Sequence, residues 1–173
     1  MQRATKQRRG QKADVELDGS PDEETAAFFN AKPPFRVWLR LLACANLIGN
    51  QVRTRLRTEF DATLPRFDVL AELDASRRPL TMGELSNRLM VTTGNVTGLI
   101  DAMEDDRLVR RVPHPSDRRS IWIDMTKEGR ALFNRMAPAH QMWIDDILQQ
   151  MTRAELDLLL ELLGKLKRSC RTS

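Results

Sequence analysis

The chain has 173 residues, a formal net charge of +4 at pH 7 and a sequence pI near 9.5. This length suffices for one well-buried core, and so for one domain with extensions. No apolar run is long enough to span a membrane, the first residues lack the apolar centre of a signal peptide, and two cysteines, Cys44 and Cys170, are too few for a disulfide framework. We therefore expect a cytoplasmic, reduced protein, and the modest basic excess suits an anion-binding surface.

The first 32 residues form a charged arm, with basic residues followed by acidic ones. A flexible, solvated tail is the simpler interpretation of this pattern. An arm that contacts phosphates beside a main binding site is the alternative.

Pro33 and Pro34 mark the entry to a long helix, which we expect from Phe35 to Thr58. Its apolar residues form two stripes, and a helix that is apolar on two faces is expected to be buried on two sides. Cys44 lies on one stripe, where a small buried side chain is the usual role. A short helix is predicted next, from Asp61 to Leu73, followed by a loop that contains Arg77, Arg78 and Pro79.

The stretch from Thr81 to Thr126 predicts a helix, a turn, a second helix and a β-hairpin. Thr81 and Glu84 have the spacing of a capping box, and Thr92 is a second N-cap candidate. In the second helix, apolar residues at helical spacing predict a buried face: Val96, Leu99, Ile100 and Met103.

The opposite face of this second helix carries Gly94 and Gly98, flanked by Asn95 and Thr97. A glycine inside a helix costs about 1 kcal/mol relative to alanine, so two of them need a reason. Close approach to a DNA major groove would supply one, with Asn95 and Thr97 as small hydrogen-bonding groups. Close packing on another helix is the alternative.

Two predicted strands follow, over Leu108–Val112 and Ser120–Met125. Ile121, Ile123 and Met125 alternate as on a half-buried strand. The segment between the strands is polar and basic, and arginines at a hairpin tip beside a helix-turn-helix can reach the minor groove.

The sequence DRRSIWIDMT at 117–126 resembles the wing signature of MarR-family transcriptional regulators, with Met125 where leucine is usual. The segment LMVTTGNVT at 89–97 resembles the turn and recognition helix of that family. This resemblance is most specific across 81–126 and extends loosely from about Phe35 to Arg168. It implies a mainly α fold with a small β-hairpin wing, in which a winged helix-turn-helix is embedded in a helical dimerisation core.

After the wing, Thr126 is expected to cap a second long helix, which Pro138 must kink or break. Thr152 and Glu155 form another capping box, and a leucine stripe from Leu156 to Leu166 marks the final helix. A winged helix of this size does not need these helices for its own core. We therefore assign 61–130 to the winged helix-turn-helix and 33–60 with 131–173 to a shared homodimer core.

These features predict a dimeric, sequence-specific DNA-binding regulator, acting as a repressor on an inverted-repeat operator. By resemblance, Arg119 is the minor-groove arginine, Asp117 orients it, and Arg118 contacts phosphate. The expected DNA-binding residues are Thr92, Thr93, Asn95, Thr97, Gly98, Asp117, Arg118 and Arg119.

The family resemblance also implies a small-molecule pocket between the dimer core and the winged helix. The helices concerned offer apolar walls and possible anion partners, which suits an aromatic acid or its CoA thioester as the effector. The expected ligand residues are Arg36, Trp38, Arg40, Phe67, His140 and Trp143. Plain core packing and a solvated arginine face are the alternative for these same residues.

Other functions have less support in the sequence. The only histidines, His114 and His140, stand in no metal-ligand spacing, and no motif of a catalytic or nucleotide-binding loop occurs, so we expect no enzyme, metal or cofactor. A winged helix used for protein interaction remains open, since Asp101 and Asp105 lie on the outward side of the second helix. Cysteine redox sensing is a further alternative that the family resemblance raises, because some relatives sense peroxides through a cysteine near the start of the first helix. Those sensors also use nearby tyrosines, and this chain has no tyrosine.

Overall fold

The structure is a computed structural model that describes residues 32–113 and 120–170, except for the side chain of Thr93. The chain divides into two units, 1–44 and 45–173, which are considered separately. No helix among the described residues is long and apolar enough to cross a membrane.

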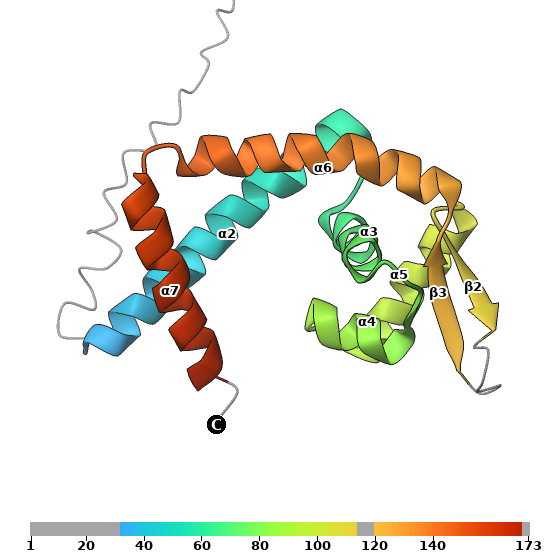
Figure 1. The fold of residues 1–173 in the computed structure, drawn as a ribbon, viewed down its shortest axis with the longest axis horizontal. Coiled ribbons are helices and arrows are strands. Elements are labelled where there is room, and N and C mark those ends of the chain that lie inside the picture. The colour runs from blue at the N-terminus through green and yellow to red at the C-terminus, as the bar shows by residue number, and fades with distance from the viewer. Residues whose placement is uncertain (1–31, 114–119, 171–173) are drawn as a thin grey trace, which may run out of the picture. The chain divides into compact units, whose positions relative to one another are not determined.

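The unit 45–173 contains the predicted helices and hairpin in the predicted order, with one further short strand, β1 (Figure 1). The last turns of α2 (Pro33–Phe60) lead into α3 (Leu64–Ser76), β1 (Leu80–Thr81), α4 (Met82–Leu89) and α5 (Thr93–Asp105). The hairpin of β2 (Val109–Pro113) and β3 (Ile121–Met125) follows, and then α6 (Lys127–Leu148) and α7 (Arg153–Ser169). The mainly helical fold with a small β wing is confirmed.

Helix α3 begins three residues later than the sequence predicted. Asp61 has the left-handed φ of 49°, and Thr63 is extended, so 61–63 form a turn rather than the first helical residues. Pro65 then fits in the first helical turn, where the missing amide proton costs nothing. At the other end, Arg77 takes a left-handed φ of 53° and its N–H donates to the carbonyl of Asp74, which ends the helix.

The sheet is antiparallel with strand order β1-β3-β2, and β1 is a strand that the sequence analysis missed. Ile123 is fully buried between Leu80 of β1 and Arg111 of β2, its partners in register. Ile121, expected on the same half-buried face, is 48% exposed, because it pairs with Pro113 at the far end of the hairpin, beyond the reach of β1.

One core fills the winged helix, with side chains from α3, α4, α5 and the sheet completely buried; among them are Leu70, Leu85, Val96, Ile100, Met103 and Ile123. The last two turns of α2 contribute Val52 and Leu56, and α6 contributes Phe133 and Met136. Gly129, in the first turn of α6, faces the carbonyl of Leu108 so closely that any Cβ would collide with it. This contact seats α6 against the base of the wing.

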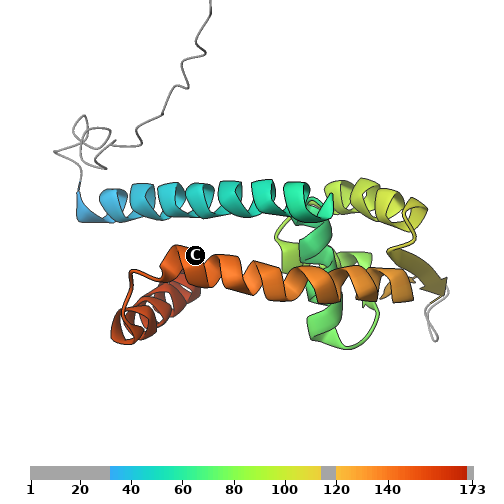
Figure 2. The ribbon, with the colours of Figure 1, turned by 90° about the horizontal axis from the view of Figure 1, so that it is seen from above.

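Helix α6 continues through Pro138 without a break, so of the two expected outcomes, a kink or a break, the break does not occur. Pro138 is exposed, and water can satisfy the carbonyl of Asn134 that its missing N–H leaves free. Within 45–173, α6 leads away from the wing, and α7 follows at its opposite end (Figures 1 and 2).

Helix α7 begins with the predicted capping box of Thr152 and Glu155, yet none of its residues is buried. Its leucines are exposed by 36–69%, apart from the half-buried Leu156; they are Leu158, Leu159, Leu160, Leu162, Leu163 and Leu166. The stripe that the sequence analysis recognised is therefore without a covering surface in the described part of one chain.

The described part of the first unit, residues 32–44, consists of Lys32 and the beginning of α2. Phe35, Val37, Trp38 and Leu42 are exposed by 42–56%. Cys44 is also exposed, so its expected role as a small buried side chain is wrong for the single chain. Among the described residues, nothing fully covers these four apolar side chains.

Candidate nucleic-acid interface

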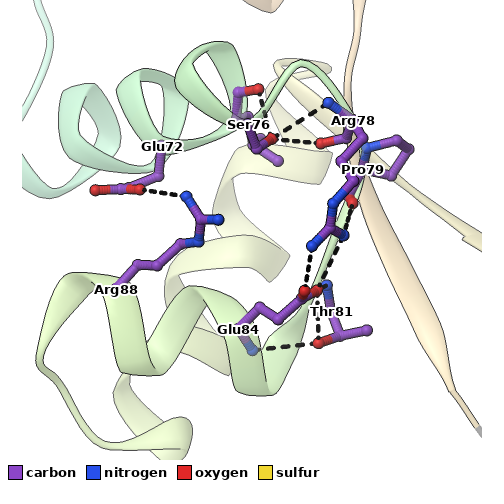
Figure 3. Close-up of polar contacts among 8 residues, drawn as sticks. Glu72, Ser76, Arg78, Pro79, Thr81, Glu84 and Arg88 are labelled. Carbon is purple, nitrogen blue, oxygen red and sulfur yellow. Dashed lines mark hydrogen bonds and ion pairs between the residues drawn. The ribbon is translucent and has the colours of Figure 1, made fainter.

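The first helix of the helix-turn-helix is fixed at its start by a complete capping box (Figure 3). The Thr81 hydroxyl accepts from the backbone N–H of Glu84 at 3.2 Å, and the Glu84 carboxylate accepts from the N–H of Thr81 at 2.8 Å. Arg78 donates to the same carboxylate at 2.5 Å. The hydrogen bonds from Arg78 and Thr81 lower the pKa of Glu84 to about 2.

The turn between α4 and α5 consists of three residues, 90–92. Met90 has a left-handed φ of 55°, and the N–H groups of Met90 and Val91 both donate to the carbonyl of Ser86. Thr92 is the N-cap of α5, as predicted, although its hydroxyl makes no capping hydrogen bond. This short turn sets the axis of α5 with respect to α4.

The two faces of α5 differ as the sequence predicted. Val96, Ile100 and Met103 have no exposed surface, whereas Asn95 and Thr97 are exposed. Thr92, Gly94 and Gly98 are exposed as well, and Thr93 is the first residue of the helix. The exposed face thus carries small polar groups and two glycines.

The glycines of α5 are not explained by packing within the described part of the chain. A Cβ built on Gly94 or on Gly98 would meet no heavy atom within 4 Å there. Neither glycine has a left-handed φ, so the backbone does not require glycine either. The expected close approach of another molecule to this face therefore stays a prediction.

The second half of α5 is bound to the wing through Arg111 of β2. Its guanidinium donates to the Asp101 carboxylate at 2.5 Å and forms an ion pair with Glu104. The Glu104 carboxylate also accepts from the backbone N–H of Arg111 at 2.8 Å, and these bonds lower the pKa of Glu104. Sequence reasoning missed this contact and took Asp101 as a weak argument for protein interaction, but the carboxylate is paired internally.

The wing carries a second arginine pair on the neighbouring residue of the same strand. Arg110 donates twice to the carboxylate of Asp124, its partner in register on β3, at 2.5 and 3.0 Å. This pair joins strand to strand and does not reach α5. The hairpin tip at 114–119, with the predicted Asp117, Arg118 and Arg119, lies outside the described residues.

Three of the six expected ligand residues meet in one aromatic cluster of the unit 45–173. His140 of α6 stacks on Phe67 of α3 with ring centroids 4.6 Å apart, and Trp143 lies edge-on to His140 at 6.4 Å. Phe67 and Trp143 are buried, and burial lowers the pKa of His140. Arg55 of α2 lies over the Trp143 ring at 5.8 Å, a cationic group that sequence reasoning did not select.

The other three expected ligand residues, Arg36, Trp38 and Arg40, belong to the first unit and are exposed on α2. Among the described residues, no cluster of histidine, cysteine or acidic side chains could hold a metal ion.

Comparison with known proteins finds similarity to transcriptional regulators. A family model described as "MarR family" matches residues 60–120. The transcriptional activatory protein BadR of Rhodopseudomonas palustris is 34% identical over 143 residues, which cover 77% of this chain and 79% of BadR. The HTH-type transcriptional repressor YetL of Bacillus subtilis is 34% identical over 102 residues, or 58% of this chain, and the match spans only 61% of YetL.

Solved structures agree with these sequence matches. AbsC, a MarR-family regulator from Streptomyces coelicolor, superposes with a TM-score of 0.73 over 79% of this chain and 93% of its own, at 24% identity. A mutant of MarR from E. coli, solved in complex with operator DNA, gives a TM-score of 0.67 over 73% of this chain and 91% of its own, at 25% identity.

Proposed function

The chain belongs to the MarR family of DNA-binding transcriptional regulators, and we propose that it binds an inverted-repeat operator as a homodimer and represses transcription until an anionic aromatic molecule releases it. A regulator of this kind acts on the DNA of the cell, so we propose a cytoplasmic localisation.

The observation that carries the DNA-binding surface is the exposed face of α5. Two helical glycines that no neighbour in the described part of the chain requires lie beside Asn95 and Thr97, which can hydrogen-bond to base edges. We assign base reading to Asn95 and Thr97, close approach of the groove to Gly98, and phosphate contacts to Thr92 and Thr93 at the helix N-terminus.

For the wing, the assignment continues from the sequence. Arg119 enters the minor groove, Asp117 orients it, and Arg118 contacts phosphate. In this assignment the wing binds the minor groove and α5 binds the major groove. The ion pairs of Arg111 with α5 support it, because they fix the base of the wing to that helix.

The glycines offer a test that separates DNA contact from folding. Changing Gly94 and Gly98 to alanine should stabilise the free protein, by up to about 1 kcal/mol at each position, because alanine is the better helix former and the space is open. The same variant should bind operator DNA more weakly, because two methyl groups now stand between the helix and the groove.

The measurement is thermal unfolding together with fluorescence anisotropy on the gene's own upstream DNA. Gly83→Ala is the matched control, since a Cβ there also meets open space but lies on α4. An Asn95→Ala/Thr97→Ala variant and Arg119→Ala should each lose about 1–3 kcal/mol of binding free energy. If all three variants bind like the unaltered protein, this surface is not the one that reads DNA.

The homodimer is supported by the exposed leucines of α7 and the exposed apolar residues at the start of α2. A second copy of the chain would cover such surfaces and hold two recognition helices at a fixed separation. Repression follows the description of YetL, whereas BadR is described as an activator. A reporter gene fused to the upstream region, with and without the regulator gene, decides the direction of control.

For the effector, the supporting observation is the aromatic cluster of Phe67, His140 and Trp143 with Arg55 over one ring. Phe67 and Trp143 are buried by their neighbours and offer a ligand little surface. His140 is half-exposed, so a ligand ring would enter beside its edge. Arginine suits a carboxylate or the phosphates of a CoA thioester.

The roles of Arg36 and Arg40 are tested by mutation. A thermal-shift panel of aromatic acids and their CoA thioesters should first yield a compound that also releases DNA. An Arg36→Ala/Arg40→Ala protein should then bind DNA normally and stop responding to that compound. A normal response would remove these two arginines from the ligand site.

A further inference from the structure

A hollow that shares no residue with the aromatic cluster lies beside the helix-turn-helix. Its volume is about 450 Å³, within the range of small-ligand pockets. Its walls come from the start of α3, the end of α4, the turn and the first two turns of α5, and they are mostly apolar: Pro65, Leu89, Val91, Val96 and Leu99. Two polar side chains, Asp68 and Asn95, complete the lining.

Asp68 is the unusual member of this lining. The other acidic residues of α3 each have an arginine partner, since Glu72 pairs with Arg88 at 3.2 Å and Asp74 pairs with Arg130. Within the described part of the chain, the half-buried carboxylate of Asp68 has no hydrogen bond and no cation.

The nearest arginine in sequence is not available to Asp68. Arg66 pairs with Asp106, at the end of α5, at 2.5 Å. Burial, and secondarily the negative charge of Glu72, raise the pKa of Asp68, as expected for a carboxylate without a counter-charge. An unpaired carboxylate against an apolar wall is what a cationic group would complete.

We propose that this hollow binds a small organic cation, a protonated amine with an apolar body, whose charge pairs with Asp68 while its body packs on Leu89, Val91 and Leu99. The carboxylate excludes a DNA phosphate as the occupant by charge repulsion. Asn95 at the same hollow can accept or donate one further hydrogen bond.

The position of the hollow would let a bound cation change the affinity of the protein for DNA. Asn95, Val96 and Leu99 belong to α5, and Asn95 lies on the face to which we assign base reading. A bound amine should therefore lower DNA affinity, and DNA should lower amine affinity by the same factor. This consequence rests on the proposed function, whereas binding of the amine does not.

The experiment uses three probes of one body size on the full-length protein: phenethylamine, the neutral phenethyl alcohol and the anionic phenylacetate. Calorimetric titration without DNA should show binding of the amine, at least tenfold weaker binding of the alcohol, and the weakest binding for the acid. Asp68→Asn should reduce amine affinity at least tenfold and leave the fold intact, because no partner of Asp68 is lost.

Asp105→Asn is the matched control, since it removes the same charge from an exposed site of the winged helix that does not line the hollow. Amine affinity should stay within about twofold there. Val91→Trp, which enlarges a half-exposed wall residue, should block the amine by filling the hollow.

Equal binding of amine and alcohol, an unchanged affinity in Asp68→Asn, or no amine binding at all would overturn the proposal. If the amine binds through Asp68 but the protein binds no upstream DNA, the cation site stands and the proposed function fails. The two failures are therefore distinguishable.

Discussion

The winged helix and helix α7 are built by the same local rules but end in opposite states. Each starts a helix with a complete Thr–Glu capping box, at Thr81 in α4 and at Thr152 in α7, and each places leucines at helical spacing. In α4 of the winged helix, Leu85 is fully buried in the core and Leu89 is half-buried, whereas α7 has no buried residue. Local sequence thus determines where a helix begins, but whether its apolar face is covered depends on what packs against it.

The largest effect that this comparison predicts concerns α7. Replacing Leu159 and Leu160 with alanine removes four leucines from the proposed dimer interface, at about 1.5 kcal/mol or more each, together roughly 6 kcal/mol of association free energy. Light scattering should show monomers at concentrations where the unaltered protein is dimeric. Glu161→Ala, an exposed change on the same helix, should leave the dimer unchanged. A dimer of undiminished affinity in the double variant would contradict the role of α7.

The second effect concerns the closed core. Ile100→Ala should lower the free energy of unfolding by about 2–5 kcal/mol, because a fully buried side chain leaves a cavity. Urea unfolding at two protein concentrations separates this loss from a loss of dimerisation, since the change should be the same at both. A cost that appears only on dilution would place Ile100 in an interface instead.

The third effect sharpens the comparison within the winged helix, between two adjacent arginines. Arg111→Gln removes the guanidinium that pairs with Asp101 and Glu104 and leaves only the backbone N–H bond between the wing and α5, so operator binding should weaken by about 1–2 kcal/mol. Arg110→Gln removes only a strand-to-strand pair and should change binding much less. Footprinting adds a second readout, since Arg111→Gln should lose minor-groove protection before major-groove protection. Equal effects of the two variants would mean that the wing needs no fixing to α5.

The smallest effect concerns the capping box of α4 and its pH dependence. The pKa of Glu84 falls from its ordinary 4.5 to about 2 in the folded protein, so its contribution to stability is present above about pH 4.5 and is lost as the pH falls through 2. Glu84→Gln should therefore flatten the stability curve between these values, as measured by thermal unfolding. A curve as steep as that of the unaltered protein would assign the acid sensitivity to other carboxylates.

How far the sequence predicted the fold follows from the range of the interactions involved. The capping boxes at Thr81 and Thr152 and the buried face of α5 depend on residues three or four apart, and all were predicted. The start of α3 was misplaced, because the left-handed backbone at Asp61 has no glycine to signal it.

The candidate site shows the same limit. The exposed face of α5 follows from periodicity, but the bonds from Arg111 to Asp101 and Glu104 join a strand to a helix and leave no local pattern. The sequence also could not predict that Asp68 has no ion pair among the described residues. That depends on the pairing of nearby arginines with other carboxylates, as Arg66 pairs with Asp106 and Arg88 with Glu72. The exposure of Cys44 depends on what covers α2, which periodicity does not reveal.

The most direct test of the account is the dependence of DNA affinity on the spacing of two half-sites. With half-sites from the footprinted upstream region placed about 10 bp apart, centre to centre, both recognition helices of a dimer meet the same face of the duplex. Inserting about 5 bp turns one half-site to the opposite face, and the affinity should fall to that of a single half-site. Equal affinity for the two spacings, measured by fluorescence anisotropy at one salt concentration, would contradict a homodimer that reads two major grooves with α5.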